Sequence, residues 1–399
     1  MSKPIVTFED FIKRILKVVL WVVLLVILIG VPMYYLLNAV FHFPIDLFAV
    51  VRALTMKPLD FLTSMQKLLS TEPYKTLFAL TVFPGFTFVA VYGTIFMGWV
   101  ERKFTAKIQL RTGPMYAGRV EGILQNIADF FKLFFKEMII PYGVDKASFV
   151  AVPLALMGVA LALVALLPLS PTTYIANPSV GAILAFAILG FTPLIVLLAG
   201  WASNSKYSFL GGLRALHQMV AYEIPLVLSL VGTVLLAGAL NLAPLVPGGP
   251  SIVTAQSKVW FVVLQPIGAI VFYIGALAEV ERIPFDLPEA DSEIVAGWQT
   301  EYTSMFYGTF QLVNFTRMYV LAGLFTTFFL GGWLGPAPAP PEVWFILKTT
   351  AVLLVMMLPR SIMPRLRIDL LLRAGWVRLL ALSFLNIFLT MVIVSLGVV

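Results

Sequence analysis

The stretch SFVAVPLALMGVALALVALLP, residues 148–168, runs for 21 residues without a charged side chain. A helix rises about 1.5 Å per residue, so an apolar run of about 20 residues crosses the roughly 30 Å hydrocarbon core of a bilayer. Because such a run has no polar face to turn toward water, it predicts a transmembrane helix. That prediction decides the class of fold.

Uncharged runs of similar length recur along the whole chain. The chain is 60% hydrophobic and only 12% charged, with a mean hydropathy of +0.97, whereas about a quarter of the residues of soluble domains are charged. We therefore predict an all-α polytopic membrane protein, and we find neither an internal repeat nor the paired interrupted spans typical of secondary transporters. Nine transmembrane helices are expected, at about 18–41, 77–100, 148–168, 181–203, 223–241, 259–279, 303–333, 342–358 and 379–398.

The placement of Lys and Arg predicts the orientation, because cytoplasmic loops retain an excess of both. With the N-terminus in the cytoplasm and the C-terminus outside, the inward segments hold 20 of the 27 basic residues. The net charge of +7 therefore reports topology in an inner (plasma) membrane, and nucleic-acid binding is not expected. These inward segments are 1–17, 101–147, 202–217, 281–300 and 359–378.

The supply of metal-binding side chains limits the chemistry of this chain. It has no cysteine, which excludes disulfides, iron–sulfur clusters and thiolate metal sites. Its two histidines, His42 and His217, are too few for a haem or a histidine-rich metal centre. We predict no metal site, and any electrons must be held by a partner.

One inward segment contains a helix of its own. In VEGILQNIADFFKLFFKEMI, residues 120–139, apolar side chains follow i, i+3, i+4, i+7 spacing while charged and amide side chains take the other face. Periodicity alone favours an amphipathic interfacial anchor on the cytoplasmic side. A second amphipathic stretch, within residues 43–76, is expected at the outer interface.

The stretch AEVERIPFDLPEADSEIVAGWQTEY, residues 278–302, concentrates acid in an oily chain. A solvated loop is one interpretation, since like charges one turn apart cost only a few tenths of a kcal/mol on an exposed helix. Its position argues otherwise, because Glu279 ends one span and Glu301 begins the next. Carboxylates in a low-dielectric zone have raised pKa values and can exchange protons near neutral pH. The seven acids are Glu279, Glu281, Asp286, Glu289, Asp291, Glu293 and Glu301, against the single base Arg282.

Ionisable residues inside spans are candidate functional residues. Glu223 begins one span, and with Glu279 and Glu301 it could form a polar seam in which proton relay is favoured over structural pairing. Arg317 lies inside the seventh expected span, one turn after Asn314. Lys348, inside the eighth, is equally compatible with a functional role and with snorkelling or structural pairing.

Five blocks of sequence resemble one known family, the membrane H subunit of NADH-quinone oxidoreductase (respiratory complex I), whose mitochondrial counterpart is NADH dehydrogenase subunit 1. The resemblance runs from about residue 77 to the C-terminus and covers eight of the nine spans. It leaves residues 1–76 as an extra N-terminal helix and interfacial segment. The blocks are VERKFTAKIQLRTGP (100–114), EGILQNIADFFKLFFKEMIIP (121–141), GWASNSKYSFLGGLRALHQMVAYEIPL (200–226), AEVERIPFDLPEADSEIVAGWQTEY (278–302) and LPRSIMPRLRIDLLLRAGW (358–376).

The resemblance implies that the inward loops form the floor of a quinone chamber, which two hydrophilic partner subunits close. One of these partners carries the terminal iron–sulfur cluster, so clusters and flavin belong to partners and quinone is the substrate. Antiporter-like membrane subunits are further expected partners. The residues implied to line or shape the chamber are Arg102, Asp129, Lys132, Arg282, Phe285 and Asp286.

The resemblance also implies a route for protons. A doubly reduced quinone is a dianion that demands protons, and nearby carboxylates of raised pKa can donate them or respond to the new charge. Glu289, Asp291 and Glu293 match the family's acidic loop, whereas Glu223, Glu279 and Glu301 match the carboxylates that lead into the membrane.

The sequence departs from the family pattern in the acidic stretch and in the seventh span. Where the family usually reads AETNR, this chain has Ala278-Glu279-Val280-Glu281-Arg282, with an added acid at Glu281. Where the family usually reads LAEY, it has Leu312-Val313-Asn314-Phe315, so a membrane carboxylate is missing and Arg317 follows one turn later. The onward proton route toward the antiporter-like subunits is therefore not expected to follow the family pattern unless Lys348 or a partner substitutes for the missing carboxylate.

We expect a subunit that couples quinone reduction to proton translocation and is inactive alone. Three alternatives stay open: the corresponding subunit of a membrane-bound hydrogenase, a stand-alone ion channel or transporter, and a scaffold that docks a peripheral arm. Activity of the isolated chain in liposomes would favour the channel or transporter. Unchanged pumping in Glu279→Gln and Glu301→Gln would favour the scaffold.

Overall fold

The computed structural model describes residues 96–118, 121–171, 174–246, 248–336 and 341–396. The described part is helical and has no β-strand, which confirms the all-α prediction. Residues Phe88–Val399 form one compact unit. The expected span 18–41, most of 77–100, and the proposed N-terminal segment 1–76 lie outside the described residues.

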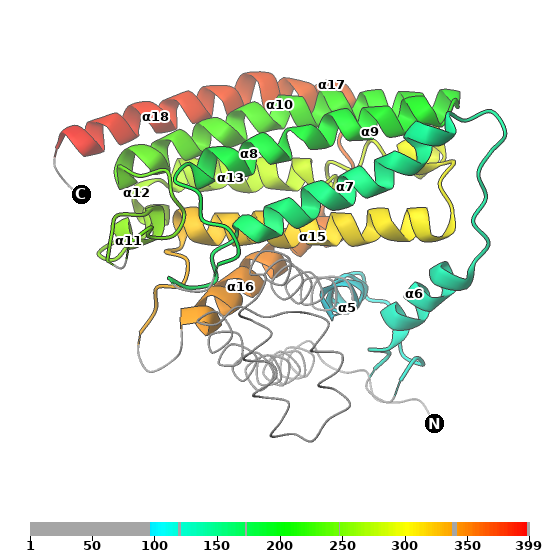
Figure 1. The fold of residues 1–399 in the computed structure, drawn as a ribbon, viewed down its shortest axis with the longest axis horizontal. Coiled ribbons are helices and arrows are strands. Elements are labelled where there is room, and N and C mark those ends of the chain that lie inside the picture. The colour runs from blue at the N-terminus through cyan, green and yellow to red at the C-terminus, as the bar shows by residue number, and fades with distance from the viewer. Residues whose placement is uncertain (1–95, 119–120, 172–173, 247, 337–340, 397–399) are drawn as a thin grey trace, which may run out of the picture. The chain divides into compact units, whose positions relative to one another are not determined.

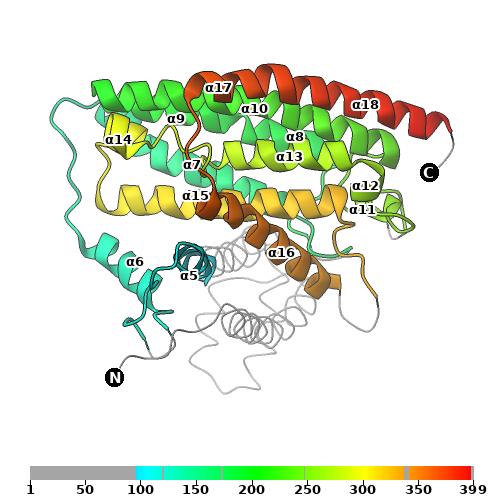
Figure 2. The same cartoon turned by 180° about the vertical axis from the view of Figure 1, so that it is seen from behind.

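Six helices of the described part are long and apolar enough to cross a membrane. Figures 1 and 2 show most of them running lengthwise beside one another, with α16 crossing at an angle. The six are α7 (Lys146–Leu166), α8 with α9 (Gly181–Leu189 and Phe191–Ala202), α10 (Lys206–Ala237), α15 (Ser304–Phe329), α16 (Pro341–Ile362) and α17 through α18 (Ile368–Arg373, a π-helical turn Ala374–Leu379, and Leu380–Ser395).

The expected span 259–279 is interrupted in the structure. A short helix α12 (Phe261–Leu264) is followed by α13 (Pro266–Glu279), and Gln265 between them has non-helical backbone angles. Pro266 lacks an N–H and suits the first turn of a helix, so it restarts the helix there. At about 1.5 Å per residue, the 14 residues of α13 alone are shorter than a bilayer core.

Two expected boundaries are wrong. Residues 202–217 were expected to form an inward loop, but α10 begins at Lys206 and carries Arg214. Residues 359–378 were expected to lie between spans, but α16 runs to Ile362 and α17 begins at Ile368. Charge marks where the hydrocarbon ends, whereas a helix continues beyond that point until its hydrogen-bonded turns are interrupted.

The helix α10 is central to the packing, because it contacts α9, α13 and α18, while α15 contacts α7 and α16. Both α13 and α15 pack against α10, so the connection between them is held at one end of the bundle. That end also holds the beginnings of α7 and α10, as Figure 2 shows beside the label of α14. The loop that carries most of the acids therefore lies against packed helices.

Two further helices lie on the chain before α7. They are α5 (Gly98–Ile108) and α6 (Gln125–Phe135), which contact each other, and α6 also contacts α15. The helix predicted within 120–139 is thus confirmed over its central residues. Four phenylalanines of α6, Phe130, Phe131, Phe134 and Phe135, are exposed in the single chain.

Candidate functional site

The connection between α13 and α15 is a folded structure, with a short helix α14 (Asp291–Ile294) and a 3-10 turn η2 (Gly297–Gln299). Gly297 has φ +57°, and a Cβ there would lie 1.6 Å from the carbonyl oxygen of Pro288. A Cβ on Gly211 of α10 would lie 2.4 Å from the backbone nitrogen of Trp298. The loop therefore closes tightly on itself and on α10.

Aromatic side chains fix the far end of this loop. The ring of Trp298 lies 4.8 Å from that of Phe310 in α15, and Tyr302 stacks on Phe149 of α7 with ring centroids 4.0 Å apart. All four side chains are buried. The acidic stretch is thus built into the core of the bundle, which argues against a purely solvated loop.

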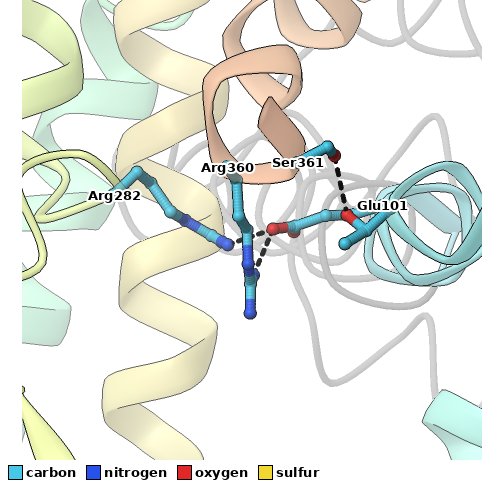
Figure 3. A network of polar contacts seen from close by, with 5 residues as sticks. Glu101, Arg282, Arg360 and Ser361 are labelled. Atoms are coloured by element: carbon cyan, nitrogen blue, oxygen red, sulfur yellow. Dashed lines mark hydrogen bonds and ion pairs between the residues drawn. The ribbon is translucent and has the colours of Figure 1, made fainter. Parts of the chain in front are cut away.

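A buried carboxylate joins three separate parts of the chain. Figure 3 shows Glu101 of α5 reaching between Arg282, from the loop after α13, and Arg360 of α16. Each arginine donates a hydrogen bond to Oε1 of Glu101, which is only 3% exposed. Beside them, Ser361 donates to Oγ1 of Thr105 at 3.1 Å or accepts from it. One negative charge therefore ties two cations together at this point.

A cavity of about 340 Å³ lies beside this network. The guanidinium carbon of Arg282 is 4.9 Å from the ring centre of Phe315, so the wall combines a cation with an apolar ring. The volume is in the range of small-molecule sites, about 300–1,000 Å³. Its charged and aromatic lining residues are Glu101, Arg102, Arg111, Arg282, Phe315 and Arg360.

Of the three residues predicted from VERK and ADFFK, one lines the cavity and two lie on α6. Arg102 lines the cavity and forms an ion pair with Asp129 of α6 at 2.6 Å. Asp129 also accepts a hydrogen bond from Gln125 at 3.1 Å. Lys132 is exposed on α6. The pair between Arg102 and Asp129 holds α6 against α5.

Phe285 and Asp286 shape the loop more than the cavity. The buried ring of Phe285 lies 5.0 Å from that of Tyr222 in α10, and Asp286 forms an ion pair with Arg365 at 2.9 Å. Neither is among the described residues that line the cavity. These contacts anchor the turn of IPFDLP to α10 and to the segment between α16 and α17.

The last residue of α13 is paired inside the bundle. Arg317 of α15 lies with Nη2 2.9 Å from Oε1 of Glu279, and both side chains are 1% exposed. The same guanidinium donates to the backbone carbonyl of Glu279. Two residues further on, Glu281 is also buried, and burial first and the Glu289 carboxylate second raise its pKa well above the ordinary value.

The other acids of the loop occupy different environments. Glu289 accepts a hydrogen bond from Gln299 within the loop, whereas Glu293 is exposed and pairs with Arg214 of α10 at 2.5 Å. Asp291 begins α14, and Glu301 is half-buried just before α15. The acids therefore range from the exposed Glu293 of α14 to the buried Glu279 at the end of α13.

Glu223 lies within α10, against the junction of α8 and α9. A Cβ on Gly190, the residue between those two helices, would lie 2.7 Å from Oε1 of Glu223. The absence of a side chain at Gly190 thus leaves the space that the carboxylate occupies. The acid is half-buried and faces a helix junction.

The structure brings Arg102 and Arg282 to one cavity and gathers Glu279, Glu281 and Glu289 around the base of the acidic loop. The sequence reasoning had not identified Glu101, Arg111, Arg360 or Arg365. Glu101 and the two arginines it binds are 181 and 259 residues apart along the chain. The charged residues in VERK and LPRSIMPRLR indicate possible ion-pair partners, but the sequence does not show that Glu101 binds Arg360.

Metal chemistry finds no support in the described residues, which contain no group of three or more His, Cys, Asp and Glu side chains that could hold a metal ion. The donor set of the cavity is instead cationic. It suits a ligand with oxygen acceptors and an apolar body.

Comparison with known proteins shows the family of the chain. The family model described as NADH dehydrogenase matches residues 81–391. The NADH-quinone oxidoreductase H subunit of Bacillus cytotoxicus is 44% identical over 308 residues, which are 76% of this chain and 90% of the relative. The protein of the same name from Geobacillus thermodenitrificans is 41% identical over 331 residues, covering 78% of this chain and 97% of the relative. Since the family model and these relatives cover most of the chain, it belongs to the NADH dehydrogenase family.

Proposed function

We propose that the chain is the membrane subunit of a complex-I-like NADH-quinone oxidoreductase and that the cavity beside Glu101 and Arg282 receives the quinone headgroup. The observation that carries this is the lining of the cavity, where the arginines Arg102, Arg111, Arg282 and Arg360 meet the ring of Phe315. Family membership supports the same assignment. The chain acts as one subunit of an enzyme and is inactive alone.

The lining fits the chemistry of a quinone. Quinone carbonyls accept hydrogen bonds, which guanidinium groups donate, and reduction places negative charge on those oxygens, which nearby cations stabilise. Complete reduction takes two electrons and two protons. The electrons come from a partner, because this chain has no cysteine for an iron–sulfur cluster. Asp129 and Lys132 shape the chamber from α6, whereas Phe285 and Asp286 hold the loop that follows Arg282 in place.

The acidic loop couples this chemistry to proton movement. Two unit charges about 6 Å apart interact by about 3 kcal/mol at an effective dielectric near 20. That energy is enough to move a proton between neighbouring carboxylates. The proposed relay comprises Glu289, Asp291 and Glu293 on the loop and Glu223, Glu279 and Glu301 at the bundle.

The assembly implied by this function includes an iron–sulfur subunit next to the cavity, a flavin-bearing subunit and antiporter-like membrane subunits. The decisive experiment is purification of the tagged chain from native membranes, followed by mass spectrometry and a quinone reductase assay. We expect an iron–sulfur subunit and inhibitor-sensitive activity. Copurification of a hydrogen-evolving partner would favour the hydrogenase alternative, and the absence of any iron–sulfur partner would overturn the proposal.

Two variants test the cavity itself. Arg282→Met removes a cation from the lining and is expected to lower kcat/KM for quinone by at least about 100-fold, the usual scale for losing a buried charged hydrogen-bond donor. Arg378→Met removes an exposed arginine and serves as the control. Equal activity in the two variants would place the quinone elsewhere.

The stand-alone alternatives make different predictions. A channel or transporter gives ion flux in liposomes that contain only this chain, whereas the proposed subunit gives none. A scaffold keeps its proton-to-electron ratio when Glu279 or Glu301 is changed to glutamine, whereas a coupling subunit loses it. Both measurements use the assembled enzyme as the positive control.

We also propose the plasma membrane as the location, with a cytoplasmic N-terminus. The chain has no native cysteine, so single cysteines report topology directly. Tyr142 and Val246 are exposed positions on segments expected to face opposite sides. An impermeant maleimide applied to intact cells is expected to label Val246→Cys and to label Tyr142→Cys only after lysis. The reverse pattern would invert the topology.

A further inference from the structure

Two acids at the end of α13 differ sharply in their surroundings, although they are two residues apart. Glu279 is bound by Arg317, which donates both to its carboxylate, at 2.9 Å, and to its backbone carbonyl. Glu281 is 4% exposed, yet neither of its carboxylate oxygens accepts a hydrogen bond from the described residues. Among the described residues, one acid therefore has a cation bound to its carboxylate and the other does not.

The pair of Glu279 and Arg317 favours the ionised form of Glu279. An arginine side chain is not deprotonated in proteins, so Arg317 stays charged at its 1% exposure. A buried cation without a partner is strongly destabilising, and the carboxylate of Glu279 is the counter-ion of Arg317. Protonation of Glu279 would remove that counter-ion. The pair with Arg317 consequently keeps Glu279 in its ionised form.

The surroundings of Glu281 favour its neutral form. The charged groups that face it are the carboxylates of Glu289, Glu279 and Asp286 and the guanidinium of Arg317. Three of these four groups are acids, and the base already binds Glu279. A buried carboxylate without a hydrogen-bond donor is strongly disfavoured, whereas a carboxylic acid is tolerated.

The backbone supports a role for Glu281 beyond packing. It has φ +54°, in the left-handed region that side chains other than glycine, asparagine and aspartate rarely adopt. A residue held there is strained, and such residues cluster at functional sites. With this backbone conformation, Glu281 lies inside the protein while its neighbour Arg282 lines the cavity.

We propose that Glu281 holds the exchangeable proton at the base of the acidic loop, and that Arg317 is a positioning residue that keeps Glu279 as a fixed carboxylate. The inference rests on the proposed coupling function and divides the roles of the relay acids. In the step itself, the O–H bond of Glu281 breaks and the proton binds the carboxylate of Glu289. No electron moves and the total charge is conserved.

Infrared difference spectroscopy of the assembled enzyme tests this assignment, because a protonated carboxyl has a carbonyl band that a carboxylate lacks. Reduction of the quinone is expected to remove the carbonyl band of protonated Glu281 and to add that of protonated Glu289 in the wild-type protein. Glu281→Asn should abolish the change, since asparagine suits the left-handed backbone but holds no acid proton. Glu281→Asp should retain the band at a shifted frequency, and the exposed Glu137→Gln should leave it as it is.

A second arm tests Arg317. Without the guanidinium, Glu279 is a buried acid with no counter-ion, so Arg317→Met is expected to add a protonated carboxyl band to the resting spectrum. The double variant Arg317→Met/Glu279→Gln should lose this added band. Arg317→Lys, which restores a cation, should not gain it.

Proton pumping gives an independent readout. Glu281→Asn is expected to lower the rate of coupled proton transfer by at least about 100-fold, the low end of the usual contribution of a positioned proton donor, and Glu281→Asp to restore part of it. Loss of the native infrared band in Glu279→Gln but not in Glu281→Asn would overturn the inference. A wild-type enzyme that lacks quinone reductase activity would instead overturn the proposed function, so the two failures are distinguishable.

Discussion

The Nζ atom of Lys348 lies 2.6 Å from the carbonyl oxygen of Leu330, and this contact closes the C-terminal end of α15. The same ammonium donates to the carbonyls of Gly332, at 3.2 Å, and Leu334, at 2.6 Å. It also lies 4.4 Å from the ring centre of Trp260. Its three N–H donors are therefore all engaged with backbone carbonyls of the C-cap residue of α15 and of the loop that follows it.

Lys348 is consequently expected to stabilise the fold and not to carry protons. Lys348→Met leaves buried carbonyls without donors and should lower the free energy of unfolding by about 2–4 kcal/mol, whereas Lys348→Arg should lose less. Thermal unfolding of the solubilised protein measures the loss. The proton-to-electron ratio of the assembled enzyme should match the wild-type value. Normal stability with lost pumping would contradict this role.

Lys348 and Arg317 show where sequence reasoning stops. Each is a cation inside an apolar span, and the sequence predicts that such a group needs a partner. It does not reveal that Lys348 binds backbone carbonyls while Arg317 binds Glu279, which lies 38 residues earlier. Partners are chosen by the packing of helices, and the order of apolar runs does not encode that packing residue by residue.

The positions of the spans were predictable because the length of an apolar run has a direct physical meaning. The ends of helices were less predictable. The helix α10 begins at Lys206, before its apolar part, and only the following proline indicates the break at Gln265. The cavity was predicted in part. Arg102 and Arg282 came from motif resemblance, whereas Arg360 is brought to them only by the fold.

Replacement of Glu101 tests the buried ion network, because the carboxylate of Glu101 lies between two guanidinium groups. Glu101→Gln removes the carboxylate that binds both Arg282 and Arg360, and breaking a buried pair costs about 3–5 kcal/mol. We expect impaired assembly and a raised KM for quinone, measured in membranes at matched protein levels. Ser361→Ala removes one neighbouring hydrogen bond and should cost only about 1 kcal/mol. Similar effects in both variants would show that the charge is unimportant.

Gly297 is expected to be indispensable for the loop. Gly297→Ala would place a Cβ within 1.6 Å of the carbonyl oxygen of Pro288, at a residue with φ +57°. The loop must unfold locally to relieve this overlap, so quinone reductase activity should be lost. The matched control is Gly238→Ala, since Gly238 has φ +60° but nothing within 4 Å of a Cβ. That variant meets only the left-handed strain, about 1–2 kcal/mol, and should stay active.

Gly190 tests the position of Glu223. A methyl group at Gly190 would lie 2.7 Å from Oε1 of Glu223, so Gly190→Ala must displace that carboxylate. We expect the proton-to-electron ratio to fall more than the rate of quinone reduction in the presence of an uncoupler. Gly158→Ala, in α7, meets nothing within 4 Å and should be neutral or stabilising by up to about 1 kcal/mol. Equal ratios in both variants would remove Glu223 from the relay.

The pH dependence of stability follows from the burial of Glu281. Its pKa is raised well above the ordinary value by burial first and by Glu289 second, so the folded protein keeps a proton that the unfolded chain releases above about pH 4.3. The contribution of the neutral acid is fully present below that pH and is lost as the pH rises through the folded pKa.

Glu281→Gln keeps the shape of the neutral acid and cannot ionise, so it should unfold at a higher temperature than the wild-type protein at about pH 8. Each unit by which the pKa is raised corresponds to about 1.4 kcal/mol. The difference between the two proteins should shrink as the pH falls toward about 4.5. Glu137→Gln, at an exposed position, should show no such trend. If the two proteins differed by the same amount at every pH in thermal unfolding curves, Glu281 would not be a buried acid of raised pKa.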